Sequence, residues 1–421
     1  MANNYNGNSK DFDPKMTTPP PLPAQMKAQF LPAFNTPYQL RRDVPLPTPT
    51  GPFDVLIKVD AASYCHTDAV LAAGQMPPYP PVFPHIGSHE FAGTVVALSP
   101  LSHSSSLSES SNSSATTLPQ IGDRVGVPGR AFHPCGTCFE CASTPSAEDP
   151  DADGAGYSVY CPRAGNHGIS GPGGFREYAV ADSRQVAPLP AGMGAVQAAA
   201  LMCAGVTVYA ALKRCGDAGR GRRVAIIGCG GGLGHLGLQF AVGMGWTVVG
   251  VDNADAPLAV ARAVVGDGDD NRRDNMRIVD ARVETADAVV ASIGSADGKE
   301  LRGEMGVDAV VILPESQAAF DYGVALLKNH GRCVVVSFPE KGFHVSARDL
   351  VFRDVSVVGS LVGSNKLLRE MVEFAATHGV KAKIKSFPLE RLNELVAEYH
   401  KGEGGKLVVD MAMSDVADEG D

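Results

Sequence analysis

The chain has 421 residues, of which 44% are hydrophobic, and a formal net charge of −10. This length predicts two domains, and the apolar content is sufficient for large buried cores. The negative charge and the absence of a basic run argue against nucleic acid and anionic membrane surfaces as partners.

The first 25 residues predict a disordered, proline-rich tail. They have no apolar core and no arginine, and they include Asp11 and Asp13, which excludes a signal peptide and argues against a mitochondrial presequence. No apolar run is expected to be long enough to span a bilayer. We therefore expect a cytoplasmic protein, in which thiols stay reduced and clustered cysteines bind metal more often than they form disulfides.

A β-rich part follows the tail. The segments FDVLIKVDAASYC, HEFAGTVVAL and GDRVGVP predict short strands separated by glycine and proline turns. A serine-rich insert at residues 99–118 cannot pack a core, so we expect a mobile surface loop there. A second, acidic insert at residues 142–160 separates Cys141 from Cys161.

The cysteines around the second insert predict a metal site. PCGTCFECAST is rich in glycine and proline and does not resemble a core segment, so reduced core cysteines are the weaker interpretation. Four thiolates are enough for a closed tetrahedral zinc site, which leaves no position for substrate and is therefore structural. The expected ligands are Cys135, Cys138, Cys141 and Cys161.

The sequence changes character after Cys203. RRVAIIGCGGGLGHLGLQFAVGMGWTVVGVD predicts a strand, a glycine turn, a helix and a strand, and VDAVVILP and GRCVVVSFP continue this pattern. Apolar runs without polar alternation are typical of buried parallel strands. An α/β part with a doubly wound parallel sheet is therefore predicted, and two amphipathic helices and a final strand, KLVVDM, are expected after it.

The glycine turn at residues 228–234 predicts a dinucleotide site. Its glycines permit a tight turn and let backbone N–H groups approach a pyrophosphate at the helix N-terminus. At the end of the next strand, Asp252 can accept hydrogen bonds from ribose hydroxyls and would repel a 2′-phosphate. We expect NAD rather than NADP, and an ordinary tight turn is the alternative interpretation.

A second set of metal-ligating residues is scattered along the chain. Cys65 lies in SYCHTD, His89 precedes Glu90 in GSHEFAG, and Cys203 lies in LMCAGVTVY. Two thiolates and one imidazole would leave a fourth tetrahedral position open, which is the pattern of a catalytic zinc. Each residue alone is a weak signal, and spacing alone does not bring the three together.

The motifs as a group resemble the zinc-dependent alcohol dehydrogenases of the medium-chain dehydrogenase/reductase superfamily, and most closely the yeast-type branch. The resemblance extends from about Pro45 to Met411. It is carried by CHTD, G-x-HE-x-AG, GDRVGV, the cysteine cluster, LMCAGVTVY, GGLGHLGLQFA and VVGSLVG.

The resemblance implies a subunit of two domains with the active site in the cleft between them. One is a GroES-like β-barrel catalytic domain, and the other is a Rossmann domain that binds NAD. The expected division is a tail at residues 1–25, catalytic domain at 26–204, Rossmann domain at 205–358, and a return to the catalytic domain at 359–421.

The resemblance also implies a role for each matching residue. Cys65, His89 and Cys203 would hold a catalytic zinc ion, in addition to the structural one. Thr67 would hydrogen-bond the alcohol oxygen, Asp68 would orient His89, and Glu90 would lie behind the metal. The residues expected to contact the coenzyme are His66, Thr207, Gly230, Gly231, Gly232, Leu233, Gly234, Asp252 and Lys406.

The implied reaction is hydride transfer between an alcohol and NAD, which gives an aldehyde or a ketone. Zinc acts as a Lewis acid that lowers the pKa of the alcohol. The expected substrates are primary or secondary alcohols, including bulky or aromatic ones. The chain is further expected to form a homo-oligomer, either a tetramer or a dimer.

The sequence departs from the family at the proton relay and in the substrate pocket. Val70 occupies the position at which many relatives have a relay histidine. Relatives that favour ethanol have tryptophans near the positions of Met76 and Gly129–Arg130, and this chain has neither. Two alternatives remain: a zinc-free reductase of activated double bonds, and a non-catalytic dinucleotide-binding protein.

Overall fold

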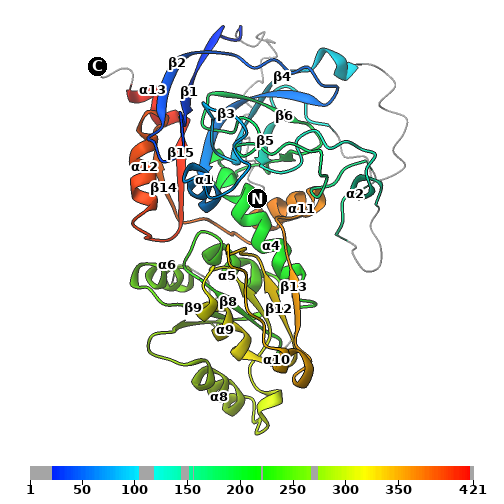
Figure 1. Ribbon diagram of the computed structural model, residues 1–421, viewed down its shortest axis with the longest axis vertical. Helices are drawn as coiled ribbons and strands as arrows, with labels where there is room; N and C mark the ends of the chain where they lie inside the picture. The colour runs from blue at the N-terminus through cyan, green and yellow to red at the C-terminus, as the bar shows by residue number, and fades with distance from the viewer. Residues whose placement is uncertain are drawn as a thin grey trace, which may run out of the picture.

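The computed structural model forms two halves, each built on its own β-sheet, along the long axis of the molecule (Figure 1). Residues 1–20 of the predicted tail (1–25) and residues 104–117 of the serine-rich insert (99–118) lie outside the described residues. The predicted tail is one residue too long at its end, because Gln25 begins strand β1. The described residues are 21–103, 118–143, 151–154, 156–219, 221–266 and 274–417.

The lower half is a parallel sheet with strands in the order β10-β9-β8-β11-β12-β13. The strands are β8 (Arg223–Ile227), β9 (Thr247–Asp252), β10 (Met276–Asp280), β11 (Val307–Ile312), β12 (Leu327–Val335) and β13 (Ser356–Gly359). The helices of this half are α5 (Gly234–Gly243), α6 (Asp255–Gly266), α8 (Ala286–Ala296), α9 (Gln317–Leu326) and α10 (Ala347–Phe352), with a short turn η3 (Arg302–Glu304).

Side-chain alternation along β8 shows why helices cover both faces of this sheet. Val224 and Ile226 pack into the core beneath α5, whereas Ala225 and Ile227 pack into the opposite core beneath α8 and α9. All four side chains are buried, which accounts for the continuous apolar run in the sequence. The predicted doubly wound α/β fold is confirmed.

The upper half is a mostly antiparallel sheet in the order β14-β15-β3-β4-β5-β7, with β6 paired to β3. Its strands are β3 (Asp54–Tyr64), β4 (Glu90–Leu98), β5 (Arg124–Pro128), β6 (Tyr178–Asp182), β7 (Ala187–Pro188), β14 (Ile384–Phe387) and β15 (Lys406–Asp410), beside a separate pair, β1 (Gln25–Phe30) and β2 (Gln39–Pro45). Its helices and turns are α1 (His66–Ala72), α2 (Phe139–Ala142), α12 (Leu392–Tyr399), α13 (Met411–Ala417), η1 (Pro100–His103) and η4 (Leu389–Arg391).

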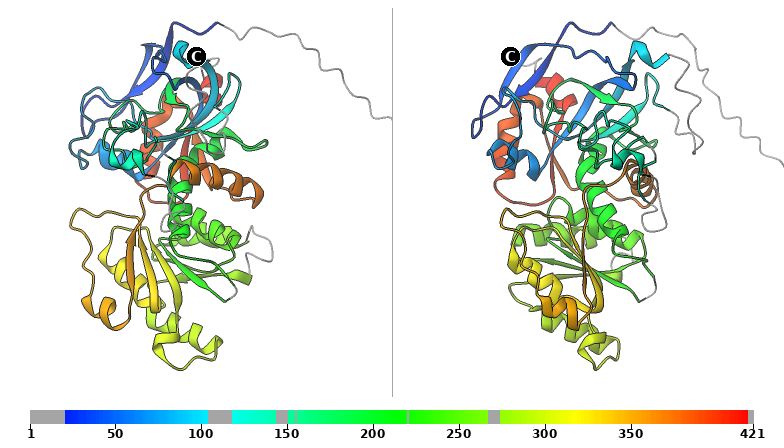
Figure 2. Two further views of the ribbon diagram at one scale, coloured as in Figure 1. Left: turned by 90° about the vertical axis from the view of Figure 1, so that its right-hand side faces the viewer. Right: turned by 45° about the vertical axis from the view of Figure 1, so that its right-hand side comes forward.

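The C-terminal part of the chain returns to the upper half. Strand β15, in red, lies beside the blue β3 (Figure 1), and their antiparallel register pairs Leu407 with Tyr64. Sequence analysis predicted β15 but missed β14, a four-residue strand between the two C-terminal helices, and α13 after the last strand. The side views in Figure 2 show the same division into two halves.

A buried helical run connects the two halves. It consists of α3 (Ala195–Ala200), a π-helical turn η2 (Leu201–Gly205) and α4 (Val206–Lys213), with α11 (Asn365–Thr377) packed beside it. Sequence analysis expected no apolar run long enough to span a bilayer. This expectation is wrong, because the helical run Ala195–Lys213 is long and apolar enough to do so, judged by length and composition alone. However, 78% of its most apolar window is buried inside the structure, as in the core helix of a globular protein.

A buried histidine also links the halves. His235 on α5 is fully buried; its Nδ1 lies 2.8 Å from the Gly231 carbonyl oxygen, and its Nε2 accepts a hydrogen bond from the Lys383 backbone N–H at 3.1 Å. Burial lowers the pKa of His235 from 6.5 to about 4. The folded chain therefore takes up this proton only at a pH at which the unfolded chain is already protonated.

We predict that His235 makes folding stability fall as pH decreases. The depressed folded pKa gives a contribution that is complete above pH 6.5 and is lost as pH falls towards about 4. In His235→Gln the slope of unfolding free energy against pH in this window should be smaller, by up to about 1.4 kcal/mol per pH unit. Urea unfolding at stepped pH measures it. The exposed His400→Gln should retain the wild-type slope, and equal slopes in all three proteins would contradict the prediction.

Candidate active site and metal centres

Three predicted metal ligands meet where the two halves join. Cys65 follows β3 and is the N-cap residue of α1, His89 precedes β4, and Cys203 lies in the π-helical turn. Their ligand atoms all lie within 4.8 Å of one another. The π-helical turn matters because the extra residue in one turn changes the direction of a side chain, and such turns are frequent at functional sites.

Asp68 fixes two segments of this cluster. One carboxylate oxygen, Oδ2, accepts the Cys65 backbone N–H at 3.0 Å and lies 3.3 Å from His89 Nδ1, and the other accepts the Ser88 N–H at 2.9 Å. The Asp68 side chain is 1% exposed, so these protein groups replace water around the charge. The contact with Nδ1 leaves His89 Nε2 as the nitrogen available to a metal ion.

A buried ion pair lies behind the same cluster. The Lys406 ammonium contacts a Glu90 carboxylate oxygen and donates to the Tyr64 carbonyl oxygen at 3.3 Å. Burial lowers the pKa of Lys406, but the neighbouring charges of Glu90 and Cys65 outweigh this effect and raise it above its usual value. Lys406 therefore keeps its charge, and sequence analysis did not foresee its pairing with Glu90.

The cluster favours a thiolate. Because the Cys65 thiol shares a hydrogen bond with Cys203 and lies near the Lys406 charge, its pKa is well below the usual value. Thiolates and neutral imidazoles are the forms that bind metals. Two sulfur atoms and one nitrogen at this separation, with no fourth cysteine or histidine in the group, are suited to a zinc ion with an open position.

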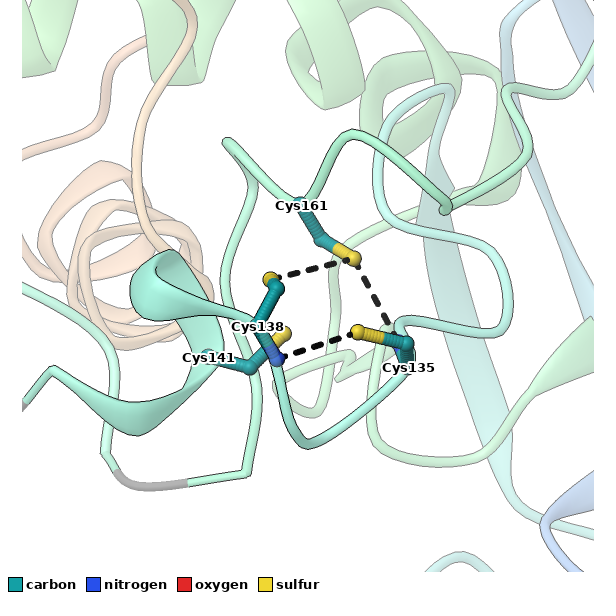
Figure 3. A group of neighbouring side chains, drawn as sticks. All are labelled: Cys135, Cys138, Cys141 and Cys161. Atoms are coloured by element: carbon teal, nitrogen blue, oxygen red, sulfur yellow. Dashed lines mark hydrogen bonds between the residues drawn. The ribbon is translucent and has the colours of Figure 1, made fainter.

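The second cysteine group converges from a loop and the end of α2 (Figure 3). The sulfur atoms of Cys138 and Cys161 are 3.9 Å apart, and Cys135 Sγ accepts the Cys138 N–H at 3.4 Å. Four sulfur atoms bound tetrahedrally to zinc at about 2.3 Å would be separated by roughly 3.8 Å. The structure thus brings all four predicted ligands together, Cys161 included: Cys135, Cys138, Cys141 and Cys161.

The thiols of this group have opposed acidities. Backbone N–H groups, first that of Thr137, lower the pKa of Cys135 to about 5, whereas burial raises the pKa of Cys141 to about 12. None of the nine cysteines, all within the described residues, forms a disulfide. A divalent cation would stabilise the ionised form of all four sulfurs, which is the chemistry expected of a closed zinc site.

The glycine turn between β8 and α5 has a shape that only glycine permits. Gly228 has φ of +80°, and a Cβ at Gly230 would lie 1.8 Å from the Pro257 carbonyl oxygen. Asp252 at the end of β9 accepts the Gly230 N–H at 3.0 Å and the Asn253 N–H at 2.9 Å. The carboxylate is thereby fixed beside the turn, where a ribose would lie next to a bound pyrophosphate.

The remaining predicted residues surround the turn and the cluster. A Cβ at Gly232 would lie 3.3 Å from Lys406 Cδ, so the two predicted sites are adjacent. Thr67 is partly buried on α1, and Thr207 is buried four residues after Cys203 on the same helical run. His66 is exposed; its Nδ1 lies 2.7 Å from the Tyr399 hydroxyl, and its Nε2 lies 3.5 Å from Glu315 in the other half.

Comparison with known proteins agrees with this geometry. Residues 51–191 match the family model described as alcohol dehydrogenase GroES-like domain, and residues 232–377 match the one described as zinc-binding dehydrogenase. Two curated relatives are an alcohol dehydrogenase of Geobacillus stearothermophilus, 32% identical over 91% of this chain and 99% of its own length, and alcohol dehydrogenase 1 of Emericella nidulans, 30% identical over 88% and 93%.

A solved structure shows the same architecture. The alcohol dehydrogenase of Aeropyrum pernix superimposes with a TM-score of 0.70 and 27% identity, over 91% of this chain and 99% of that chain. The first matched model includes Cys65, His89 and the four cysteines of the second group, and the second includes Asp252 and the end of the glycine turn from Gly232 onward. The chain therefore belongs to the zinc-dependent alcohol dehydrogenases of the medium-chain dehydrogenase/reductase superfamily, and it is an oxidoreductase.

Proposed function

We propose that this enzyme transfers a hydride between a small-molecule alcohol and NAD at the cluster of Cys65, His89 and Cys203. The observation that carries the proposal is the convergence of these three ligand atoms within 4.8 Å. Lys406 contacts Glu90, the residue after His89, and also lies beside the glycine turn. A metal with one open position would thus lie next to the coenzyme, as alcohol oxidation requires.

The protein residues position and balance this site. When bound, zinc supplies a Lewis acid and NAD supplies a hydride acceptor. Asp68 holds His89 and Cys65, and Lys406 compensates the buried charge of Glu90. Thr67 is proposed to receive the hydroxyl proton of the alcohol, and the alcohol carbon loses hydride to become a carbonyl carbon.

The proton must leave the site without a histidine at position 70. Val70 is partly buried on α1 and has no titratable group. The proposed route runs from Thr67 to the ribose of the coenzyme or to water, and then to solvent. The four cysteines of the second group are proposed to hold a structural ion, which brings the zinc content to two per chain.

Substrate size is inferred from the sequence around the proposed pocket. A Cβ at Gly129 would lie 2.6 Å from His89 Cβ, so this position cannot carry a side chain without displacing His89. Bulky or aromatic alcohols, primary or secondary, are proposed substrates because the tryptophans of relatives that favour ethanol are missing near Met76 and Gly129–Arg130. A homo-oligomer remains a prediction from the resemblance, and a cytoplasmic location remains a prediction from the N-terminal sequence.

The two alternatives lack such support. A zinc-free reductase has no use for two converging sets of cysteine and histidine ligands, and a non-catalytic protein has no need of an open metal position. NADH oxidation against a panel of aldehydes and ketones, before and after metal removal, tests the proposal. Carbonyl reduction that survives complete removal of zinc would contradict it.

Paired cysteine substitutions should separate the two metal sites. Cys203→Ser should lose one zinc and alcohol oxidation while its melting temperature stays close to that of the wild type. Cys138→Ser should also lose one zinc, but with a clear fall in melting temperature, because structural zinc contributes folding free energy. Elemental analysis, activity and thermal unfolding are measured on both variants. Two zinc ions per chain in either variant would disprove the corresponding assignment.

Asp252 should determine the coenzyme preference. The fixed carboxylate repels a 2′-phosphate, so wild-type kcat/KM should be much higher with NAD than with NADP. Asp252→Ser should narrow this ratio by roughly 10-fold or more, because one repulsive charge is removed. Initial rates with both coenzymes at fixed alcohol measure the effect. Equal wild-type efficiency with both coenzymes would refute the assignment.

A further inference from the structure

Arg130 is a partly buried cation next to the proposed catalytic centre. It directly follows Gly129, whose Cα faces His89. It also lines a small cavity of about 10 Å³ together with Val206, which follows the turn that bears Cys203, and Val362. Arg130 therefore lies between residues of the two halves, and the residue before it is in contact with His89.

The Arg130 guanidinium has N–H donors that bond to no described residue. Its Nε and Nη2 both donate to the Val159 carbonyl oxygen, at 3.2 and 3.0 Å. These bonds use the Nε–H and one N–H of Nη2. The N–H groups of Nη1 and the second N–H of Nη2, which together form the end of the guanidinium, have no acceptor among the described residues. No described carboxylate forms an ion pair with Arg130.

The surroundings of Arg130 explain why this charge needs a partner. Burial lowers its pKa, and the titratable groups that oppose this effect are the tyrosines Tyr160 and Tyr79. Tyrosine hydroxyls are neutral at physiological pH and can donate to an anion. A partly desolvated cation without an anionic neighbour is costly, so its retention requires another reason.

The backbone around Arg130 is held in an unusual conformation. Ala131 and His133, the first and third residues after it, have φ of +65° and +54°. Residues with a Cβ rarely adopt such left-handed values, and backbone strain of this kind clusters at functional sites.

The acidic insert positions the guanidinium from the other side. The Val159 N–H donates to Asp153 at 3.3 Å, and Asp153 in turn accepts the Asn365 N–H at the start of α11 at 2.7 Å. The Ser364 hydroxyl donates to the Asp151 carbonyl oxygen at 2.5 Å. Arg130 is thus oriented through Val159 by a short network that ends on a helix.

We propose that Arg130 is a specificity-determining residue that recognises a carboxylate group on the alcohol or carbonyl substrate. The free Nη1 and Nη2 end can bind both carboxylate oxygens, and Tyr79 and Tyr160 lie near it as further donors. The substrates of the enzyme would then be hydroxy acids and the corresponding oxo acids, with the anionic group at the far end of the molecule. This inference depends on the proposed function and names the substrate class of the same site.

Matched substrate pairs test the inference. The kcat/KM of ω-hydroxy acids with four to eight carbons is compared with that of 1-alkanols of equal length, with NAD and zinc-loaded enzyme. At the best chain length the hydroxy acid should be preferred on the order of 10- to 100-fold, as expected for charge-assisted hydrogen bonds. Higher ionic strength should raise KM for the hydroxy acid and leave KM for the alkanol unchanged.

Three variants locate the effect. Arg130→Gln should abolish the preference while alkanol oxidation persists, and Arg130→Lys should keep part of it, because the charge remains but the planar fork is lost. Arg41→Gln removes the same charge from the exposed strand β2 and should keep the wild-type preference. Melting temperatures show whether each variant is folded.

The outcomes separate this inference from the proposed function. If the wild type oxidises alkanols but shows no preference for hydroxy acids, the proposed function stands and the role of Arg130 is refuted. If Arg130→Gln keeps the preference, another group recognises the carboxylate and the assignment is also refuted. If no alcohol of either kind is oxidised with NAD by the zinc-loaded wild type, the proposed function itself fails.

Discussion

The buried helical run from Ala195 to Lys213 is the element on which the rest of the structure depends. Its first part packs against β3, β4 and β15 of one sheet, and its last part packs against α5, which covers the other sheet. The buried apolar surface on both sides fixes the two halves relative to each other. Because the π-helical turn lies between these two packed parts, Cys203 is placed by the core and not by a loop.

Local sequence patterns were sufficient for most of the fold. Strands such as β8, β9 and β11 are buried on both faces and appear as continuous apolar runs, and the glycine turn marks the start of α5. The π-helical turn could not be predicted, since LMCAG carries no signal that distinguishes it from an ordinary helix. Strand β14 was also missed, because each of its residues pairs with a residue of β15 that lies 22 positions further along the chain, as Ile384 does with Lys406, and four residues show no periodicity.

The candidate site divides in the same way. Three of the four clustered cysteines could be assigned to one metal site from their spacing, because they lie within one short segment. Cys65, His89 and Cys203 are brought together by tertiary structure, so their common site could be predicted only from the family resemblance. The Lys406–Glu90 pair depends on the register between β15 and β3, which no local pattern specifies. Lys406, which sequence analysis predicted only as a coenzyme contact, therefore also compensates the buried charge of Glu90.

Charge compensation connects these observations. Asp68 accepts two backbone N–H groups and contacts His89, and Glu90 lies against Lys406, so each of these buried carboxylates behind the proposed metal position is compensated by donors. Buried charges are tolerated in proteins when they are paired and hydrogen-bonded. Arg130 departs from this pattern, because its guanidinium donates only to the Val159 carbonyl oxygen and has no carboxylate partner among the described residues. Since the carboxylates of Asp68 and Glu90 are compensated by protein groups and Arg130 lacks an anionic partner among the described residues, a carboxylate of the proposed substrate would supply the missing negative charge.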